Sequence, residues 1–143
     1  MIDCLIIGDS IAVGTKQFRP DCVAFAKGGI NSNQWRKQYL DGDVGELPRA
    51  ETLIISLVSN DHKGVHTRAE ISKIRTAVTA KRVYWILPHG NNPAGGVDIK
   101  DIQAAVREVA EGFGDTVLPI KHVQADNIHP SWAGYKELGE QAK

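Results

Sequence analysis

A serine near the amino terminus is the first residue of this sequence whose surroundings suit chemistry. Ser10 follows Gly8 and Asp9 at the end of an apolar run. A serine between a strand and a helix lies at the helix N-terminus, where free N–H groups and the helix dipole favour negative charge on a nearby oxygen. Such a serine is also a common helix N-cap. The residues that accompany Ser10 therefore decide whether it is a nucleophile.

An aspartate–histidine pair near the carboxyl terminus supplies two suitable partners. Asp126 and His129 are three residues apart, a spacing that lets two side chains face each other across one helical turn or a tight loop. A carboxylate in this position orients an imidazole and stabilises its protonated form. The pair alone is equally typical of a solvated loop. Together with Ser10, it predicts a Ser-His-Asp triad.

Acyl transfer also needs hydrogen-bond donors for the oxyanion that the attack creates, each contributing about 3–4 kcal/mol in well-studied enzymes. Gly29 follows the second apolar run and Asn60 follows the third, with Gly28 as the alternative to Gly29. A glycine lets a ligand approach its backbone N–H closely. We expect the backbone N–H groups of Ser10 and Gly29 and the Asn60 side chain to be these donors, although Asn60 and Gly29 also suit ordinary turns.

Three further residues are candidates for substrate contact. Asp9 directly precedes the serine, and His89 and Asn91 belong to a loop rich in glycine and asparagine, 89–96, after the fourth apolar run. Loops at such positions often touch ligands. We expect this loop to form one wall of the substrate site.

Apolar runs and the segments between them predict the elements that position these residues. Continuous runs rich in β-branched residues are typical of parallel strands buried on both faces, and they cover residues 4–7, 22–26, 52–58, 83–87 and 116–120. Helical spacing of apolar residues is found at 31–40, 71–78, 99–113 and 132–142. The alternation predicts a three-layer α/β/α sandwich around a five-stranded parallel, flavodoxin-like sheet. In such sheets ligands bind beyond the carboxyl ends of the strands, where Ser10, Gly29 and Asn60 fall.

Composition limits the class of protein. The 143 residues suit one domain, 1–143, and the 17 basic and 17 acidic residues give no excess charge that would indicate nucleic-acid binding. No apolar run reaches the about 18 residues of a membrane span. Cys4 and Cys22 lie in apolar runs and are expected to be buried thiols. No signal peptide is recognised, so we expect a cytoplasmic protein or one exported by a non-classical route.

These motifs together resemble the sequence blocks of the SGNH, or GDSL-type, hydrolases. Residues 8–10 match the Gly-Asp-Ser of the first block, and residues 126–130 match the Asp-x-x-His-Pro of the last. Gly29 takes the place of the oxyanion glycine of the second block. Asn60 and Asp61 match the last two residues of the third block, Gly-x-Asn-Asp. In this sequence, Val58 takes the place of the glycine of that block. The resemblance spans nearly the whole chain.

The resemblance implies a serine esterase that works through an acyl-enzyme without a metal or other cofactor. Ser10 is then the nucleophile, His129 the general base and Asp126 the residue that orients it. Because the chain has no insertion long enough for an acyl tunnel, we expect short acyl groups such as acetyl, including those on carbohydrate. The alternatives are a thioesterase or lysophospholipase with the same triad, and a non-catalytic flavodoxin-like binding module, which only Val58 favours.

Overall fold

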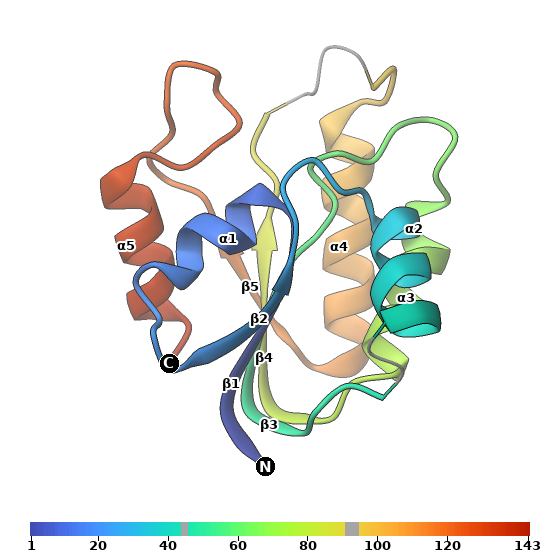
Figure 1. The fold of residues 1–143 in the computed structure, drawn as a ribbon. Helices are drawn as coiled ribbons and strands as arrows, with labels where there is room; N and C mark the ends of the chain where they lie inside the picture. The colour runs from blue at the N-terminus through green and yellow to red at the C-terminus, as the bar shows by residue number, and fades with distance from the viewer. Residues whose placement is uncertain (44–45, 91–94) are drawn as a thin grey trace.

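The protein is built around one parallel sheet. The computed structural model describes residues 1–43, 46–90 and 95–143. Its strands are β1 (Ile2–Gly8), β2 (Cys22–Ala26), β3 (Ala50–Ser56), β4 (Ala80–Leu87) and β5 (Thr116–Pro119). They form a five-stranded sheet in the order β2-β1-β3-β4-β5, and every pair is parallel (Figure 1). This is the strand order of flavodoxin-like sheets, so the predicted fold class is confirmed.

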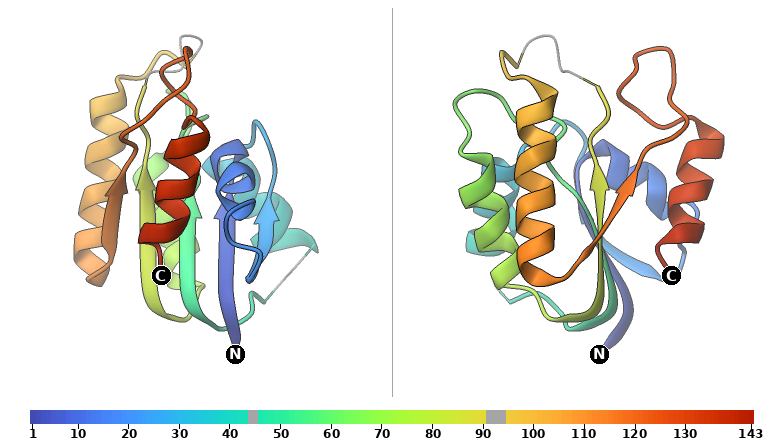
Figure 2. Two further views of the ribbon diagram at one scale, coloured as in Figure 1. Left: turned by 90° about the vertical axis from the view of Figure 1, so that its left-hand side faces the viewer. Right: turned by 180° about the vertical axis from the view of Figure 1, so that it is seen from behind.

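Helices cover both faces of the sheet and complete the predicted three layers (Figure 2). They are α1 (Ser10–Lys16), α2 (Ser32–Trp35), the π-helical η1 (Arg36–Asp43), α3 (Thr67–Thr76), α4 (Ile99–Phe113) and α5 (Trp132–Gln141). Helices α1 and α5 contact each other, as do α3 and α4, and α2 packs against α3. Among the described residues, none of the helices combines the length and hydrophobicity that a membrane span requires.

Alternate residues of the strands point to opposite faces and so build two cores. On β1, Leu5 and Ile7 face the larger core, which also contains buried residues of α3 and α4. Cys4 and Ile6 face the smaller core with residues of α1 and α5. Burial on both faces explains why the strands read as continuous apolar runs in the sequence.

The helical segment expected at 31–40 is present but is not one regular helix. Asn31 caps α2 through a reciprocal pair of bonds with Gln34, and the chain then continues into η1. Trp35 and Tyr39, four residues apart, lie on one face of this segment, with their ring centroids 5.2 Å apart. The Trp35 indole N–H donates to the Phe25 carbonyl oxygen at 2.9 Å, which fixes this segment against the end of β2.

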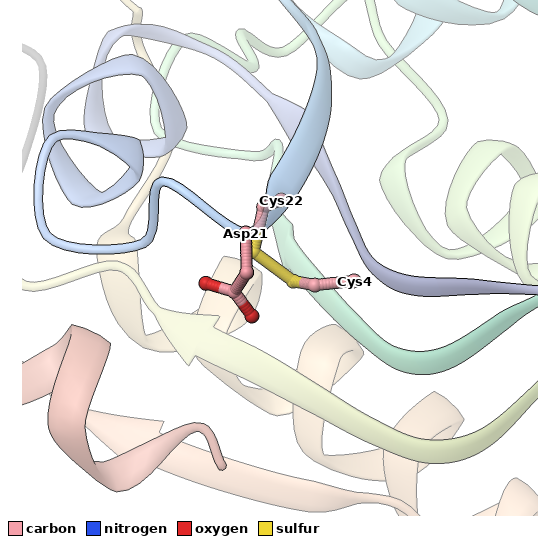
Figure 3. A group of neighbouring side chains, drawn as sticks. All are labelled: Cys4, Asp21 and Cys22. Carbon is pink, nitrogen blue, oxygen red and sulfur yellow. A yellow bond between two sulfur atoms is a disulfide. The ribbon is translucent and has the colours of Figure 1, made fainter.

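The prediction of two buried thiols is wrong in one respect, because Cys4 and Cys22 form a disulfide (Figure 3). Both residues are buried as expected, but β1 and β2 pair in a register that sets Cys4 directly beside Cys22, with their Cα atoms 4.3 Å apart. The two sulfur atoms are bonded to each other, so they offer no thiolate for a metal ion beside Asp21. The disulfide fastens edge strand β2 to the strand that leads to Ser10.

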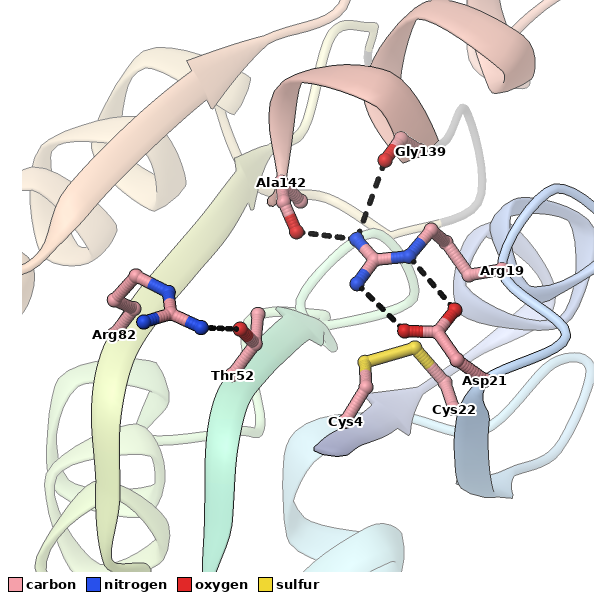
Figure 4. The surroundings of a disulfide bond; sticks show 8 residues. All are labelled: Cys4, Arg19, Asp21, Cys22, Thr52, Arg82, Gly139 and Ala142. Atoms are coloured by element: carbon pink, nitrogen blue, oxygen red, sulfur yellow. Dashed lines mark hydrogen bonds and ion pairs between the residues drawn. A yellow bond between two sulfur atoms is a disulfide. The ribbon is translucent and has the colours of Figure 1, made fainter. Parts of the chain in front are cut away.

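A buried arginine next to the disulfide fixes the C-terminal helix (Figure 4). The Arg19 guanidinium binds the Asp21 carboxylate through two bonds of 3.0 and 3.1 Å. It also donates to the carbonyl oxygens of Gly139 and Ala142 at the end of α5. Cations stabilise the C-terminus of a helix in this way. Arg19 thereby links the segment after α1 to α5, the helix that follows the predicted Asp–His pair.

Candidate active site

The predicted nucleophile lies where β1 turns into α1. Gly8 ends the strand with φ of +149°, and the Asp9 N–H then donates to the Ser56 carbonyl oxygen on neighbouring β3 at 2.8 Å. Asp9 is the N-cap of α1, and Ser10 is the first residue of the helix. Because β1 and β3 are adjacent although not consecutive, Ser10 lies at the switch point where such sheets bind ligands.

The loop between β5 and α5 carries the predicted base to the same end of the sheet, as Figure 1 shows. An antiparallel bridge between Val123 and Pro130 closes this loop, and the Gln124 N–H donates to the His129 carbonyl oxygen at 2.8 Å. At the tip of the loop, Asn127 adopts a left-handed conformation with φ of +62°. The closed loop presents the His129 ring to α1.

Ser10, His129 and Asp126 form one chain of hydrogen bonds. Ser10 Oγ lies 2.8 Å from His129 Nε2, and His129 Nδ1 lies 2.6 Å from Asp126 Oδ2. Asp126 Oδ1 accepts the backbone N–H groups of Ile128 and His129 at 2.9 and 3.0 Å. The structure therefore brings together three residues, of which Ser10 and His129 are 119 positions apart in the sequence.

The charge on Asp126 determines which atoms donate and which accept in this series of hydrogen bonds. The Ile128 N–H, the His129 side chain and the His129 N–H lower the pKa of Asp126 to about 2, so its carboxylate is ionised at neutral pH. An ionised carboxylate only accepts hydrogen bonds, and His129 Nδ1 therefore carries a proton. In the neutral ring, Nε2 is then the acceptor, and the Ser10 hydroxyl donates to it. This is the arrangement a general base needs.

The predicted oxyanion donors come from the ends of the first three strands. Ser10 begins α1, so its N–H has no intrahelical acceptor. Gly29 has φ of +79°, and its N–H has no partner in the described part of the chain. The Asn60 side-chain amide donates one hydrogen to the Ile30 carbonyl oxygen at 3.1 Å and keeps a second hydrogen. A Cβ built on neighbouring Gly28 would lie 3.9 Å from Ser10 Cβ, so this loop borders the serine. Their role as an oxyanion hole stays a prediction.

Val58 does not prevent the turn that positions Asn60. Its side chain is buried in the larger core, and its carbonyl oxygen accepts the Asp61 N–H at 3.0 Å. The valine thus fills core space while the turn forms after β3. The departure from the family pattern leaves the Asn60 amide directed at the Gly29–Ile30 segment.

Asp61 holds the two donor-bearing segments together, a role that sequence reasoning did not assign. Its Oδ1 accepts the Ser32 N–H at 2.8 Å, and its Oδ2 accepts the hydroxyls of Ser32 at 2.6 Å and Thr67 at 2.7 Å. Burial raises the pKa of Asp61, and the bonds from Ser32 and Thr67 oppose that rise. Asp61 thereby ties the segment after Gly29 to the turn that carries Asn60.

Ser32→Ala is expected to lower kcat about threefold to tenfold with little change in KM, because the Gly29 segment loses one of its bonds to Asp61. A hydrogen bond to a charged group contributes about 1.5–3 kcal/mol. Thr67→Val removes the other hydroxyl from the same Asp61 oxygen but leaves the Gly29 segment attached, so it is the matched control. Urea unfolding and steady-state ester kinetics test both. If Ser32→Ala and Thr67→Val lost the same stability and the same kcat, a positioning role for the bond between Ser32 and Asp61 would be contradicted.

The prediction that Asp9 contacts substrate is wrong. Its side chain is fully buried, and its Oδ1 accepts the Ile11 N–H at 2.9 Å as the N-cap of α1. The Ser56 hydroxyl lies 3.5 Å from the same oxygen, while Oδ2 has no partner in the described residues. Burial raises the pKa of Asp9 to about 7, although N–H groups led by that of Ile11 oppose the rise. Asp9 supports the nucleophile from inside the fold.

Asp9 should make the protein less stable as the pH rises. Its pKa is raised from 3.8 to about 7 in the fold, so its contribution is fully present below about pH 4 and is lost as the pH rises towards 7. Asp9→Asn removes this dependence. We expect the stability of Asp9→Asn relative to wild type to increase by about 2 kcal/mol between about pH 5 and pH 8 in urea unfolding. A constant difference would contradict the burial of an ionisable carboxyl.

Asp21→Asn is the matched control for that titration. Because the hydrogen bonds from Arg19 lower the pKa of Asp21, its contribution is present above about pH 4 and is lost only as the pH falls below that value. The difference in stability between Asp21→Asn and wild type should therefore stay constant between about pH 5 and pH 8.

The two remaining predicted substrate contacts differ in outcome. Asn91 lies outside the described residues. His89 Nδ1 lies 2.9 Å from the Asn127 carbonyl oxygen, so the end of β4 supports the loop that carries His129. A side chain added at Gly90 would lie 2.2 Å from the same oxygen, which shows how closely the two loops pack. A contact between His89 and substrate stays a prediction.

Comparisons with known proteins agree with this architecture. No protein-family model matches the chain, and no curated protein sequence matches it. Solved structures do match. The lipase/acylhydrolase from Enterococcus faecalis has a TM-score of 0.72 at 18% identity, covering 98% of this chain and 92% of that one. A GDSL-like lipase from Bacteroides thetaiotaomicron has a TM-score of 0.70 at 17% identity, covering 99% and 89%.

A third similar structure is the C-terminal catalytic domain of Streptococcus pneumoniae peptidoglycan O-acetyltransferase A. Its TM-score is 0.69 at 16% identity, with 97% of this chain and 89% of that one covered. Sequence identities this low show the fold alone. The chain has the fold of the SGNH, or GDSL-type, hydrolases, and the resemblance read from its motifs is confirmed at that level.

Proposed function

We propose that this protein is a serine esterase that hydrolyses acyl esters through an acyl-enzyme, in one catalytic domain over residues 1–143. The observation that carries the proposal is the continuous chain of hydrogen bonds from Ser10 through His129 to Asp126. A binding module has no need of a serine hydroxyl that donates to an oriented imidazole. The likeness of the fold to lipases and acylhydrolases supports the same reaction class.

Each residue has a defined part in the proposed reaction. Ser10 Oγ attacks the acyl carbonyl carbon while its proton passes to His129 Nε2, and Asp126 stabilises the imidazolium that forms. The Ser10 and Gly29 N–H groups and the Asn60 amide hold the oxyanion. His129 then protonates the departing alcohol, which leaves the acyl group on Ser10. Water, deprotonated by His129, attacks the acyl carbon and releases the acid and the free serine.

The experiment that tests this function is labelling with a fluorophosphonate, followed by intact mass measurement. The reagent reports an activated serine without a guess at the substrate. We expect a single adduct on the wild-type protein and none on Ser10→Ala. Absence of an adduct on folded wild-type protein would contradict the proposed function and leave the flavodoxin-like binding module.

For the substrate, we propose esters of short acyl groups such as acetyl, including acetyl groups on carbohydrate. The chain spans the fold in 143 residues and adds no long insertion that would enclose an acyl chain. One of the similar folds belongs to a peptidoglycan O-acetyltransferase domain, which handles an acetyl group. A series of nitrophenyl esters tests the proposal, with the highest kcat/KM expected for acetate. A maximum at long acyl chains would instead indicate a lysophospholipase or thioesterase.

For the location, we propose an oxidising compartment. Disulfides persist in such compartments and are rare in the reducing cytosol, and Cys4 and Cys22 are paired. Of the two locations expected from the sequence, the pairing favours export. Alkylation of protein taken from its native source, followed by mass measurement, should find no free thiol. Two alkylated cysteines would contradict the proposal.

A further inference from the structure

A hollow lies next to the nucleophile, and apart from the Gly29 N–H its lining has no part in the chemistry described above. It encloses about 300 Å³ and is lined by Lys27, Gly28, Gly29, Ile30, Gln34 and Gln38. Two of these residues connect it to the triad. A Cβ at Gly28 would lie 3.9 Å from Ser10 Cβ, and Gly29 carries a predicted oxyanion donor. One part of an ester held at Ser10 therefore lies beside this hollow.

The side chains of the hollow present mainly hydrogen-bond donors. The Gln34 carbonyl oxygen is occupied, because it accepts the Asn31 N–H at 3.0 Å in the cap of α2. Its NH₂ group is left for a ligand. Gln38 follows one helical turn later, is half-buried, and its side chain has no hydrogen-bond partner in the described residues. The Gly29 N–H is also free of partners there. A lining of this kind suits a ligand rich in acceptor oxygens.

The hollow also carries a positive charge that pairs with no carboxylate among the described side chains. Lys27 is the one charged residue among those that line it, and it forms no ion pair within the described ranges. Among the described side chains of the adjacent helices α2, η1 and α3, the acidic ones are Asp41 and Glu70, and both are engaged. Arg36 binds Glu70 at 2.5 Å and Asp41 at 2.5 Å. Those carboxylates are therefore paired with a cation other than Lys27.

We propose that this hollow is a subsite for a carboxylate carried by the ester substrate, with Lys27 supplying the charge and Gln34 and Gln38 the hydrogen bonds. The proposal rests on the esterase function proposed above and names a substrate class for it. The carboxylate belongs either to the acyl part or to the alcohol part of the ester. Either source places the same chemical group beside the same donors.

Two matched pairs of substrates test the subsite and distinguish the sources. An aryl hemisuccinate compared with the aryl butyrate places the anion on the acyl part, and 4-acetoxybenzoate compared with 4-acetoxybenzamide places it on the alcohol part. We expect wild-type kcat/KM to favour the anionic member of one pair about fivefold, mainly through KM. Lys27→Gln should reduce that ratio to about one, and Lys27→Glu should reverse it. Lys81→Gln, at the opposite end of the sheet on β4, should keep the wild-type ratio.

The outcomes separate this proposal from the esterase function. If Ser10 takes up the fluorophosphonate and neutral esters are hydrolysed, but neither pair shows a preference for the anion, the subsite is refuted while the esterase stands. A preference that survives in Lys27→Gln refutes it as well. If Ser10 is not labelled and no ester is hydrolysed, the esterase function fails and the subsite fails with it.

Discussion

Ser10→Ala is expected to lower kcat for ester hydrolysis by about 10⁴-fold or more, because it removes the only nucleophile in the hydrogen-bonded chain with His129 and Asp126. The structure should be retained, since the Ser10 side chain is only partly buried and α1 is capped by Asp9. Steady-state assays with an acetyl ester measure the loss, and far-ultraviolet circular dichroism checks the fold. Activity above about a hundredth of wild type would contradict the assignment.

The base is tested by comparing two histidines at the same end of the sheet. His129→Ala should lower kcat by a similar factor, since the His129 ring accepts the serine proton. His89→Ala is the control, because the His89 ring contacts the carbonyl oxygen of Asn127 and no member of the triad. We expect His89→Ala to alter mainly KM. If His89→Ala were the inactive variant, the triad as described would be wrong.

The largest effect on stability is expected for Gly8→Ala. A Cβ at Gly8 would lie 1.7 Å from the Ser56 carbonyl oxygen, and φ of +149° is a conformation that residues with side chains rarely adopt. Relief would require β1 and β3 to separate where Asp9 and Ser10 are positioned. We expect a loss of about 4 kcal/mol or more in the free energy of unfolding, which exceeds the effect of most substitutions. If the Gly8→Ala variant yields no soluble protein, the loss of stability is large enough to prevent folding.

Gly112→Ala provides the matched control for that substitution. Gly112 lies within α4, and a Cβ there would have no neighbour within 4 Å. Alanine is about 1 kcal/mol more favourable than glycine inside a helix, so this variant should be as stable as wild type or more stable. Urea unfolding of both variants tests the comparison. A Gly8→Ala loss below about 1 kcal/mol would contradict the close contact between β1 and β3.

Local pattern was sufficient to predict the sheet and the order of its elements. Strands buried on both faces require continuous apolar runs, and the predicted run 22–26 agrees with β2 residue for residue. The predicted helix 99–113 agrees with α4, where Gly114 ends the helix in a left-handed conformation. The run 52–58 extends past β3, because Leu57 and Val58 are buried in the core without belonging to a strand. A continuous apolar run therefore indicates that its residues are buried, whether or not they pair in a strand.

Residue types and their order along the chain were enough to predict which residues reach the carboxyl end of the sheet. Parallel strands all end at the same edge, so chemically capable residues placed after them converge there whatever the details of packing. Ser10 and Asn60 follow this rule directly. His129 follows it because a closed loop after β5 returns it to the same edge. Residue types, their spacing and the order of the strands were sufficient to predict that these residues lie at one edge of the sheet.

How residues distant in the sequence pair, and which of them are buried, became visible only in the folded structure. The disulfide depends on the register of β1 against β2, and the role of Asp61 depends on Ser32 and Thr67 both lying within hydrogen-bond distance of its carboxylate. Asp9 appeared accessible beside Ser10, yet the turn into α1 directs its carboxylate inwards. Each of these outcomes follows from packing between separate segments, and the spacing of residues along one segment carries no information about such packing.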